Sequence, residues 1–282
     1  MDRQDPFSPT ARLNGTTAAV SPPSSRSSTP SPPPPVYSAA SLELLRPYFA
    51  GEPKSLSGIA LRAFCLGAAF STSILLAITL LLRGDSPLWR PPFFIAALSA
   101  FHFLEFWTTA HRNTLVASVD SFLLTANWPS YAIAHASALL ECLIVGTFFP
   151  GRHWAPGYLS PFFIASGLVM VVVGQAVRSA AMLQAGASFN HHVQTRKARS
   201  HRLVTEGVYA ALRHPSYFGF FYWGLGTQLV LGNVVCFVAY AGVLWVFFRD
   251  RIRKEEAKLV EFFRGDYVAY RERVGTKIPF IT

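Results

Sequence analysis

The segment LRHPSYFGFFYWGLG, Leu212–Gly226, places a polar cluster directly before one of the most aromatic stretches of the chain. Its Arg, His, Ser and Tyr side chains could bind an anion or a cofactor, whereas the residues after them suit a lipid bilayer. It opens an apolar block, Tyr217–Phe248, that is interrupted near its middle by LGN at residues 231–233. Each half offers roughly 15 residues, or about 22 Å of helix, which is shorter than a full crossing. We therefore expect a re-entrant or tilted helical hairpin with polar groups at its base.

The composition and four further apolar runs also indicate a membrane protein. Only 14% of the 282 residues are charged, against about a quarter in soluble domains. Each run is long enough to cross a hydrocarbon core of about 30 Å, which takes about 20 helical residues. The runs are Ile59–Leu82, Pro91–Ala110, Tyr131–Phe149 and Tyr158–Leu183. Together with the hairpin they predict an all-α integral membrane protein with about six transmembrane or re-entrant helices.

The chain divides into three predicted parts. Residues 1–55 contain SPPSSRSSTPSPPPPVYS and should form a disordered, cytosolic Pro/Ser-rich tail. Residues 56–177 hold the N-terminal transmembrane helices. Residues 178–282 form the C-terminal region, with the hairpin at 217–248 and a basic amphipathic helix from Arg249. The apolar face of that helix comprises Leu259, Phe262, Phe263 and Tyr270.

Two features of the pattern bear on topology. The segment 111–129 mixes apolar and polar positions and predicts an interfacial helix, with a fifth short span as the alternative. Of the 25 lysines and arginines, 15 lie from Arg178 onward, mostly beside apolar segments. This distribution follows the positive-inside rule and places segment 189–202 and the C-terminus in the cytosol. It argues against nucleic-acid binding, which would need a basic face on a soluble domain.

Several polar residues have both a structural and a functional interpretation. Four histidines match no compact metal-ligand spacing, so no metal site is predicted; they are His191, His192, His201 and His214. GLG at 224–226 lies inside an apolar helix and indicates close helix packing rather than a dinucleotide fingerprint.

Charged residues within or beside the spans are functional candidates by default. Glu105 and Glu141 interrupt apolar runs and have no obvious partner in the sequence. Arg178, near the end of a long apolar helix, could either snorkel to the interface or face a polar cavity. Arg251 and Glu255 are four residues apart on one helix face, which also fits an ordinary ion pair.

Two longer blocks closely resemble the isoprenylcysteine carboxyl methyltransferase family. The first is RSAAMLQAGASFNHHVQTRKARSHRLVTEGVYAALRHPSYFGFFYWGLGTQLVLGN, from Arg178, and the second is FFRDRIRKEEAKLVEFFRGDYVAY, from Phe247. The resemblance is dense over Arg178–Ile281 and continues more weakly back to Ile59, for example in FHFLEF and VDSFLL. The shorter core RHPxYxG also occurs in related membrane methyltransferases and sterol reductases.

The resemblance implies a multi-pass enzyme of the endoplasmic reticulum membrane with its active site facing the cytosol. It would methylate the carboxylate of a C-terminal cysteine that carries a farnesyl or geranylgeranyl thioether, the product of CaaX processing. S-adenosylmethionine would be the methyl donor, and Arg178 and Arg251 would bind the substrate carboxylate. The implied cofactor-binding residues are Gln194, His201, Arg202, Leu203, Val204, Tyr209, His214, Pro215, Ser216, Tyr217 and Glu255.

Elementary chemistry agrees with this implied activity. An α-carboxylate has a pKa of about 3.3–3.7, so the nucleophile is ionised at neutral pH and no general base is needed. An arginine can orient the carboxylate, and we expect Arg251 to hold one oxygen and leave the other free to attack. A prenyl tail should stay in the bilayer. Phe218, Phe220, Phe221, Tyr222 and Trp223 are then candidates to line a lateral opening, although each could equally face lipid. Arg213 is a weaker candidate for the anion binder.

Three other functions remain open at this point. The chain could methylate another membrane acceptor, such as a phospholipid amine. It could instead be a non-enzymatic membrane scaffold or sterol-binding protein that keeps the fold. A sterol reductase is disfavoured, because the resemblance extends through SFNHHVQ and RDRIRKEEAKL, beyond the shared core.

Overall fold

The computed structural model describes residues 38–84, 87–125, 128–149, 160–191, 194, 196–197 and 201–282. Within these residues every regular element is a helix, as the sequence predicts. The α-helices, in chain order, are α1 (Ala39–Leu45), α2 (Leu56–Leu82), α3 (Arg90–Arg112), α4 (Ser130–Phe148), α5 (Ser160–Ala185), α6 (Val208–Ala211), α7 (Pro215–Leu231), α8 (Val235–Phe263) and α9 (Gly265–Arg273).

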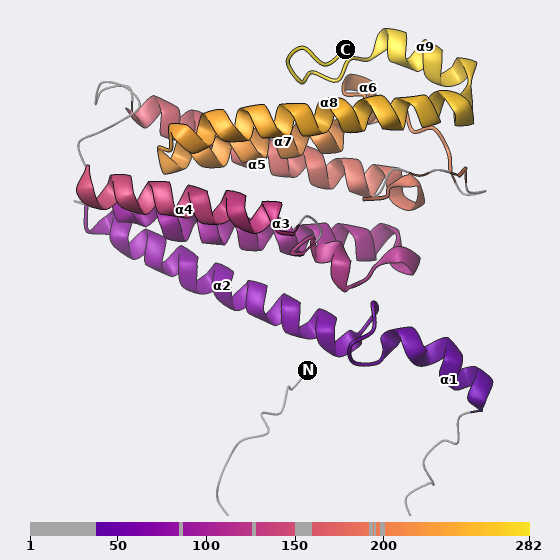
Figure 1. The fold of residues 1–282 in the computed structure, drawn as a ribbon, viewed down its shortest axis with the longest axis horizontal. Helices are drawn as coiled ribbons and strands as arrows, with labels where there is room; N and C mark the ends of the chain where they lie inside the picture. Colours follow the sequence, from indigo (N-terminus) through magenta and orange to yellow (C-terminus); the bar gives the residue numbers. More distant parts are fainter. Residues whose placement is uncertain are drawn as a thin grey trace, which may run out of the picture.

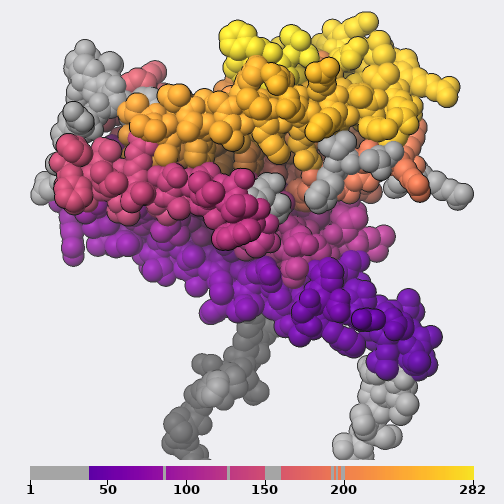
Figure 2. All heavy atoms as spheres, viewed as in Figure 1, coloured from indigo at the N-terminus to yellow at the C-terminus, as the bar shows by residue number. Residues whose placement is uncertain are grey.

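Four of these helices are long and apolar enough to cross a bilayer. Including flanking turns, they are Leu56–Leu82, Pro87–Arg112, Ser130–Phe148 and Ser160–Ser188. These are the four predicted spans, so the prediction of an all-α, multi-pass membrane protein is confirmed. In Figure 1, α2, α3 and α4 lie on one side of the molecule and α5, α7 and α8 on the other. Figure 2 shows the C-terminal half, orange to yellow, resting on the N-terminal helices.

The closest helix pairing is the antiparallel contact between α5 and α7. Gly167 faces Gly226, and Gly174 faces Gly219. A Cβ atom placed on Gly174 would lie 2.6 Å from the carbonyl oxygen of Gly219, and one on Gly226 would lie 2.7 Å from that of Gly167. Small residues allow such backbone contact in membranes, where the hydrophobic effect does not drive helices together. Gly226 belongs to the GLG motif, so its predicted role in close packing is confirmed.

The turn between α7 and α8 falls at the LGN sequence, and polar side chains satisfy its backbone. Gly232 ends α7 in the left-handed conformation, with φ of 73°, which glycine adopts at no steric cost. The fully buried Asn233 donates from Nδ2 to the carbonyl of Ala138 at 2.9 Å. Glu141 on α4 accepts the backbone N–H groups of Val234, Val235 and Cys236 at 2.7–2.9 Å. A half-buried carboxylate thus caps the N-terminus of α8.

Three expectations need correction. Residues 113–125 hold no α-helix: after α3 ends they form two short 3₁₀ turns, Thr114–Val116 and Val119–Phe122, and Ser118 and Ser121 exchange capping hydrogen bonds across the second. The basic C-terminal helix is not a separate element, because α8 continues through Arg249 to Phe263 without a break. Helix α1 lies inside the segment assigned to the tail; residues 1–37 of that tail are outside the described residues.

We predict that Gly174→Ala destabilises the protein by about 1–3 kcal/mol, because the added methyl group forces α5 and α7 apart. The expected result is a lower thermal unfolding midpoint in detergent. Gly242→Ala in α8 is the matched control, since a Cβ there meets no atom within 4 Å. Equal midpoints for the two variants would show that the α5–α7 contact tolerates expansion.

Candidate active site

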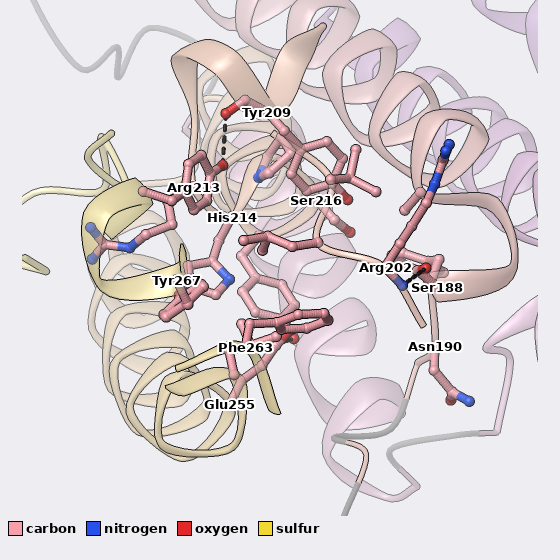
Figure 3. Close-up of a pocket in the computed structure, with 18 residues that line it drawn as sticks. Ser188, Asn190, Arg202, Tyr209, Arg213, His214, Ser216, Glu255, Phe263 and Tyr267 are labelled. Atoms are coloured by element: carbon pink, nitrogen blue, oxygen red, sulfur yellow. Dashed lines mark hydrogen bonds between the residues drawn. The ribbon is translucent and has the colours of Figure 1, made fainter. Parts of the chain in front are cut away.

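A pocket lies where the end of α5, the loop before α6, the start of α7, the end of α8 and α9 meet (Figure 3). Nine of the eleven predicted cofactor-binding residues line it. They are Arg202, Leu203, Val204, Tyr209, His214, Pro215, Ser216, Tyr217 and Glu255. Gln194 and His201 do not line the pocket. Residues far apart in the sequence thus converge on one cavity in the C-terminal half.

The pocket also contains residues that the sequence analysis did not assign to it. These are Ala185, Ser188, Phe189, Asn190, Arg213, Leu259, Phe263, Tyr267 and Tyr270. Three of them, Leu259, Phe263 and Tyr270, belong to the predicted apolar face of the C-terminal helix. That apolar face therefore lines a pocket as well as part of the core. The periodicity of the sequence alone cannot distinguish a pocket-lining residue from a core residue.

Hydrogen bonds fix the loop walls of the pocket. Ser188 Oγ accepts the backbone N–H of Arg202 at 3.2 Å, and Tyr270 OH donates to the carbonyl oxygen of Tyr209 at 2.7 Å; both are drawn in Figure 3. At the base, Pro215 begins α7, and the ring of His214 stacks on that of Tyr217 with centroids 5.5 Å apart. Burial raises the pKa of Tyr209 above its ordinary value.

Arg213 lines the pocket but is bound to other parts of the chain. Its Nε donates to Glu256 Oε1 at 2.6 Å, and its Nη1 donates to the carbonyl of Val274 at 2.8 Å. His214 Nε2 lies 3.1 Å from the same carboxylate oxygen. Burial alone would raise the pKa of Glu256, but the hydrogen bond from His214 and the charge of Arg213 outweigh it, so this pKa lies below its usual value. The cluster anchors the C-terminal segment to the base of α7.

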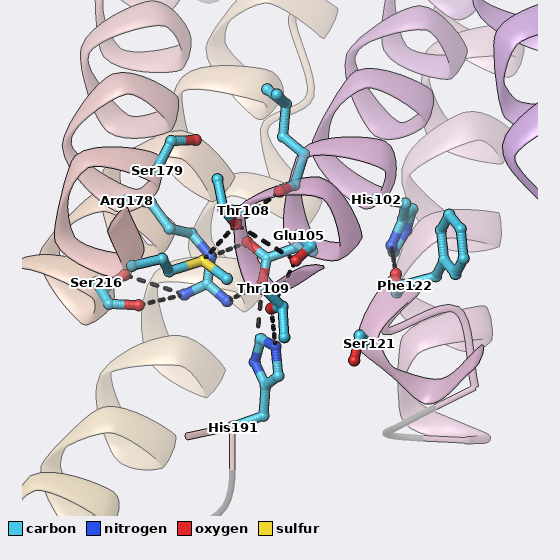
Figure 4. Close-up of polar contacts among 12 residues, drawn as sticks. His102, Glu105, Thr108, Thr109, Ser121, Phe122, Arg178, Ser179, His191 and Ser216 are labelled. Atoms are coloured by element: carbon cyan, nitrogen blue, oxygen red, sulfur yellow. Dashed lines mark hydrogen bonds and ion pairs between the residues drawn. The ribbon is translucent and has the colours of Figure 1, made fainter. Parts of the chain in front are cut away.

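Arg178 is buried, with 6% of its surface exposed, and it pairs with Glu105 of α3 (Figure 4). Nε and Nη2 donate to the two carboxylate oxygens, the latter at 2.7 Å. Nη1 donates to the carbonyl of Ser216 at 3.1 Å and to its hydroxyl at 2.8 Å. The guanidinium also lies over the rings of Phe101 and Phe220. Arg178 thus already binds a carboxylate of its own chain, a partner that sequence reasoning missed.

Arg251 has a different environment at the edge of the pocket. Its Nε donates to Tyr217 OH at 2.8 Å, and its Nη2 donates to the carbonyl of His191. Tyr217 OH in turn donates to Glu255. The i,i+4 ion pair expected between Arg251 and Glu255 is therefore replaced by a bridge through the phenol. The half-buried Arg251 contacts the pocket through Tyr217.

A second cavity lies on the membrane side, between α2, α3 and α4. Its walls are mainly apolar, with His102, Tyr131 and His135 among them. Aromatic rings connect it to the first pocket: Tyr131 lies 6.3 Å from Phe220, Phe220 lies 5.8 Å from Phe248, and Phe248 lies 5.2 Å from Tyr217, centroid to centroid.

The predicted aromatic lining is only partly present in this connection. Phe220 belongs to it. Phe221 and Trp223 are buried, with 4% and 3% of their surface exposed. The rings of Phe218 and Tyr222 pack against each other at a tilt, with centroids 4.5 Å apart. Among the described residues no cluster of His, Cys, Asp or Glu could hold a metal ion; His192 is outside them.

Comparisons with known proteins all point to one enzyme family. Residues 167–261 match the model of the isoprenylcysteine carboxyl methyltransferase family. The chain is 48% identical over 189 residues to the protein-S-isoprenylcysteine O-methyltransferase of Saccharomyces cerevisiae, covering 67% of this chain and 79% of that protein. It is 43% identical over 223 residues to the Homo sapiens protein of the same name, covering 79% and 75%.

A solved structure shares the fold. It is that of the eukaryotic intramembrane Ras methyltransferase, isoprenylcysteine carboxyl methyltransferase, without a monobody. The TM-score is 0.72 at 37% sequence identity, and the match covers 86% of this chain and 82% of that chain.

The lowered pKa of Glu256 predicts an acid-sensitive stability. A carboxylate with a lowered pKa contributes its full stabilisation above the ordinary value of 4.5 and loses it as the pH falls further. Glu256→Gln should cost about 3 kcal/mol at pH 7, because it leaves the buried Arg213 unpaired. It should also flatten the fall of the thermal midpoint between pH 4.5 and lower pH. Asp250→Asn, at a surface ion pair, is the control and should behave like the unmodified protein.

Proposed function

The chain belongs to the isoprenylcysteine carboxyl methyltransferase family, and we propose that it transfers a methyl group from S-adenosylmethionine to a prenylcysteine carboxylate at the cytosolic face of the endoplasmic reticulum membrane. Carboxyl methylation of CaaX proteins is the activity of this enzyme family. One observation carries the assignment of the site. The hydroxyl of Tyr217 joins Glu255, in the polar pocket, to Arg251, at the start of the aromatic connection toward the membrane.

The chemistry of the pocket residues fits S-adenosylmethionine. Leu203, Val204, Leu259 and Phe263 offer an apolar surface for an adenine ring. Glu255 offers a carboxylate for ribose hydroxyls, and Arg202 can contribute backbone contacts. When bound, the cofactor supplies an electrophilic methyl group on a sulfonium. The pocket residues bind and orient this group, and the apolar walls limit its contact with water.

Arg251 is the residue that we assign to the substrate carboxylate. It is half-buried at the edge of the pocket, and it donates hydrogen bonds to a phenol and a backbone carbonyl rather than to a carboxylate. A substrate carboxylate would therefore be the anionic partner of this guanidinium. The nucleophile is the substrate carboxylate, which is already ionised at neutral pH. The reaction therefore needs no general base, and the side chains need only hold the carboxylate in place. Arg178 has its own carboxylate partner, so we assign it to support rather than to substrate binding.

We place the prenyl tail in the cavity between α2, α3 and α4. The cavity lies among the spanning helices and is connected to Tyr217 by the rings of Tyr131, Phe220 and Phe248. Each buried CH₂ group contributes about 0.8 kcal/mol, so a long prenyl chain favours an apolar cavity over the cytosol. The same geometry disfavours a phospholipid amine as the methyl acceptor. Arg251 would repel an ammonium group, and it has no lone pair to accept a hydrogen bond from a neutral amine.

We predict that Arg251→Ala lowers kcat/KM for N-acetyl-farnesylcysteine and N-acetyl-geranylgeranylcysteine about 100-fold, or about 2.7 kcal/mol of transition-state stabilisation. Arg251→Lys should also lose activity, because an ammonium cannot form the paired hydrogen bonds of a guanidinium. The measurement is base-labile methyl incorporation in detergent or liposomes. Arg249→Ala is the control, since Arg249 is half-exposed and its contacts are with Asp250 and the ring of Trp245, outside the pocket. Unchanged activity of Arg251→Ala would remove it from the site.

We predict that Glu255→Gln weakens the binding of S-adenosylhomocysteine about tenfold, or about 1.4 kcal/mol, because it removes a charged acceptor from the pocket. Isothermal titration calorimetry on purified protein measures this. Glu261→Gln serves as the control, because Glu261 lies on the same helix but forms a surface pair with Lys258. If the unmodified protein does not bind S-adenosylhomocysteine, the cofactor assignment is wrong.

A further inference from the structure

We propose that Glu105, on a spanning helix outside the pocket, is a positioning residue that aligns the cofactor side of the active site with the acceptor side. This inference rests on the proposed function. Glu105 is fully buried, with 1% of its surface exposed, and it lies about two turns before the end of α3. Its carboxylate stands where two chains of contacts meet, as Figure 4 shows.

The first chain of contacts leads to the pocket wall. Glu105 binds Arg178 with both oxygens, which fixes the plane of the guanidinium. The third nitrogen of that guanidinium donates to the carbonyl and the hydroxyl of Ser216. Ser216 lies in the first turn of α7 and lines the pocket, one residue before Tyr217. The orientation of Arg178 therefore sets the position of the turn that carries Ser216 and Tyr217.

The second chain of contacts leads to the acceptor side. His191 Nδ1 lies 3.8 Å from Glu105 Oε2, the oxygen that also accepts from Arg178 Nη2, and its Nε2 lies 3.4 Å from the hydroxyl of Thr109. That hydroxyl donates to the backbone carbonyl of Glu105 at 2.8 Å, so one turn of α3 holds the ring from two sides. The carbonyl of His191 accepts a hydrogen bond from Arg251. A shift of the imidazole thus moves the residue that holds Arg251.

Stability alone is a poor explanation for this buried ion pair. Two charges in an apolar interior lose hydration that their attraction only partly restores, and apolar residues of similar volume often replace such pairs without loss of stability. Glu141 provides the comparison, because it is the other carboxylate within the spans and it caps a helix by backbone hydrogen bonds. Glu105 instead contacts two side chains, Arg178 and His191. Arg178 binds Ser216 of the pocket, and the backbone carbonyl of His191 binds Arg251.

The test compares Glu105→Gln with Glu141→Gln in the full-length protein. S-adenosylhomocysteine calorimetry gives the number of competent sites, and methylation of N-acetyl-farnesylcysteine gives kcat per competent site and KM for each substrate. We expect Glu105→Gln to lower kcat per site at least tenfold and to change each KM less than threefold. Glu141→Gln should reduce thermal stability but keep kcat per site. A purely structural Glu105 would reduce only the number of sites, and kcat per site equal to that of the unmodified protein would overturn the proposal.

A second variant keeps the proposal testable if Glu105→Gln does not fold. The double substitution Glu105→Leu with Arg178→Met removes both charges and leaves neither one unpaired. We expect it to recover the thermal midpoint and the number of sites, with kcat per site still at least tenfold low. Recovery of kcat together with stability would show that the pair only stabilises the fold.

The assay separates this inference from the proposed function. Methylation by the unmodified protein decides whether the proposed function holds, and the ratio of each variant to the unmodified protein decides the role of Glu105. Rescue by Glu105→Asp adds a further readout. The shorter carboxylate restores the charge but reaches less far, so we expect stability to recover more fully than kcat per site.

Discussion

The backbone contact between α5 and α7 fixes the rest of the active site. Because Gly174 and Gly219 have no side chains, the two helices approach until Gly219 also lies against the backbone of Arg178: a Cβ atom at residue 219 would be 2.8 Å from the nitrogen and from the Cβ atom of Arg178. This approach brings the Arg178 side chain beside the first turn of α7, within reach of Ser216. A looser pairing would leave the guanidinium too far from the pocket wall. The close packing of α5 against α7 thus also determines the geometry of the site.

The bilayer imposes a second constraint, because buried polar backbone groups find no water there. In the turn between α7 and α8, Asn233 and Glu141 form hydrogen bonds with these backbone groups. This turn is at the end of the hairpin that is remote from the pocket. At the pocket end, α8 continues past the apolar block to Phe263, so Glu255 and Glu256 stand beyond it on the same rigid helix as Phe248. One helix therefore carries both a buried ring of the aromatic connection, Phe248, and a carboxylate of the polar pocket, Glu255. Such continuity keeps their spacing constant.

Periodicity and length predicted the spans well, because a long apolar run such as Ile59–Leu82 has few alternatives to a helix. The segment after α3 was predicted wrongly, since its fold depends on local serine capping and on packing against α2 and α3 rather than on a repeat. Half of the pocket residues came from the resemblance to a family. The pairing of Glu105 with Arg178 could not be predicted, because the two lie 73 residues apart and nothing in either local sequence indicates the other. Only the α3–α5 contact reveals it.

Arg178 and Arg251 illustrate why residue type alone does not define a role. Both are arginines beside aromatic rings at the base of the hairpin. Arg178 binds a carboxylate of the same chain, so its charge is neutralised within the protein. Its hydrogen bonds orient the guanidinium. Arg251 meets a phenol and a carbonyl, which orient it without neutralising it. An arginine held this way attracts an anionic group most strongly where water is scarce. The membrane edge supplies that condition, and the carboxylate of a lipid-anchored cysteine is an anion delivered to such a place.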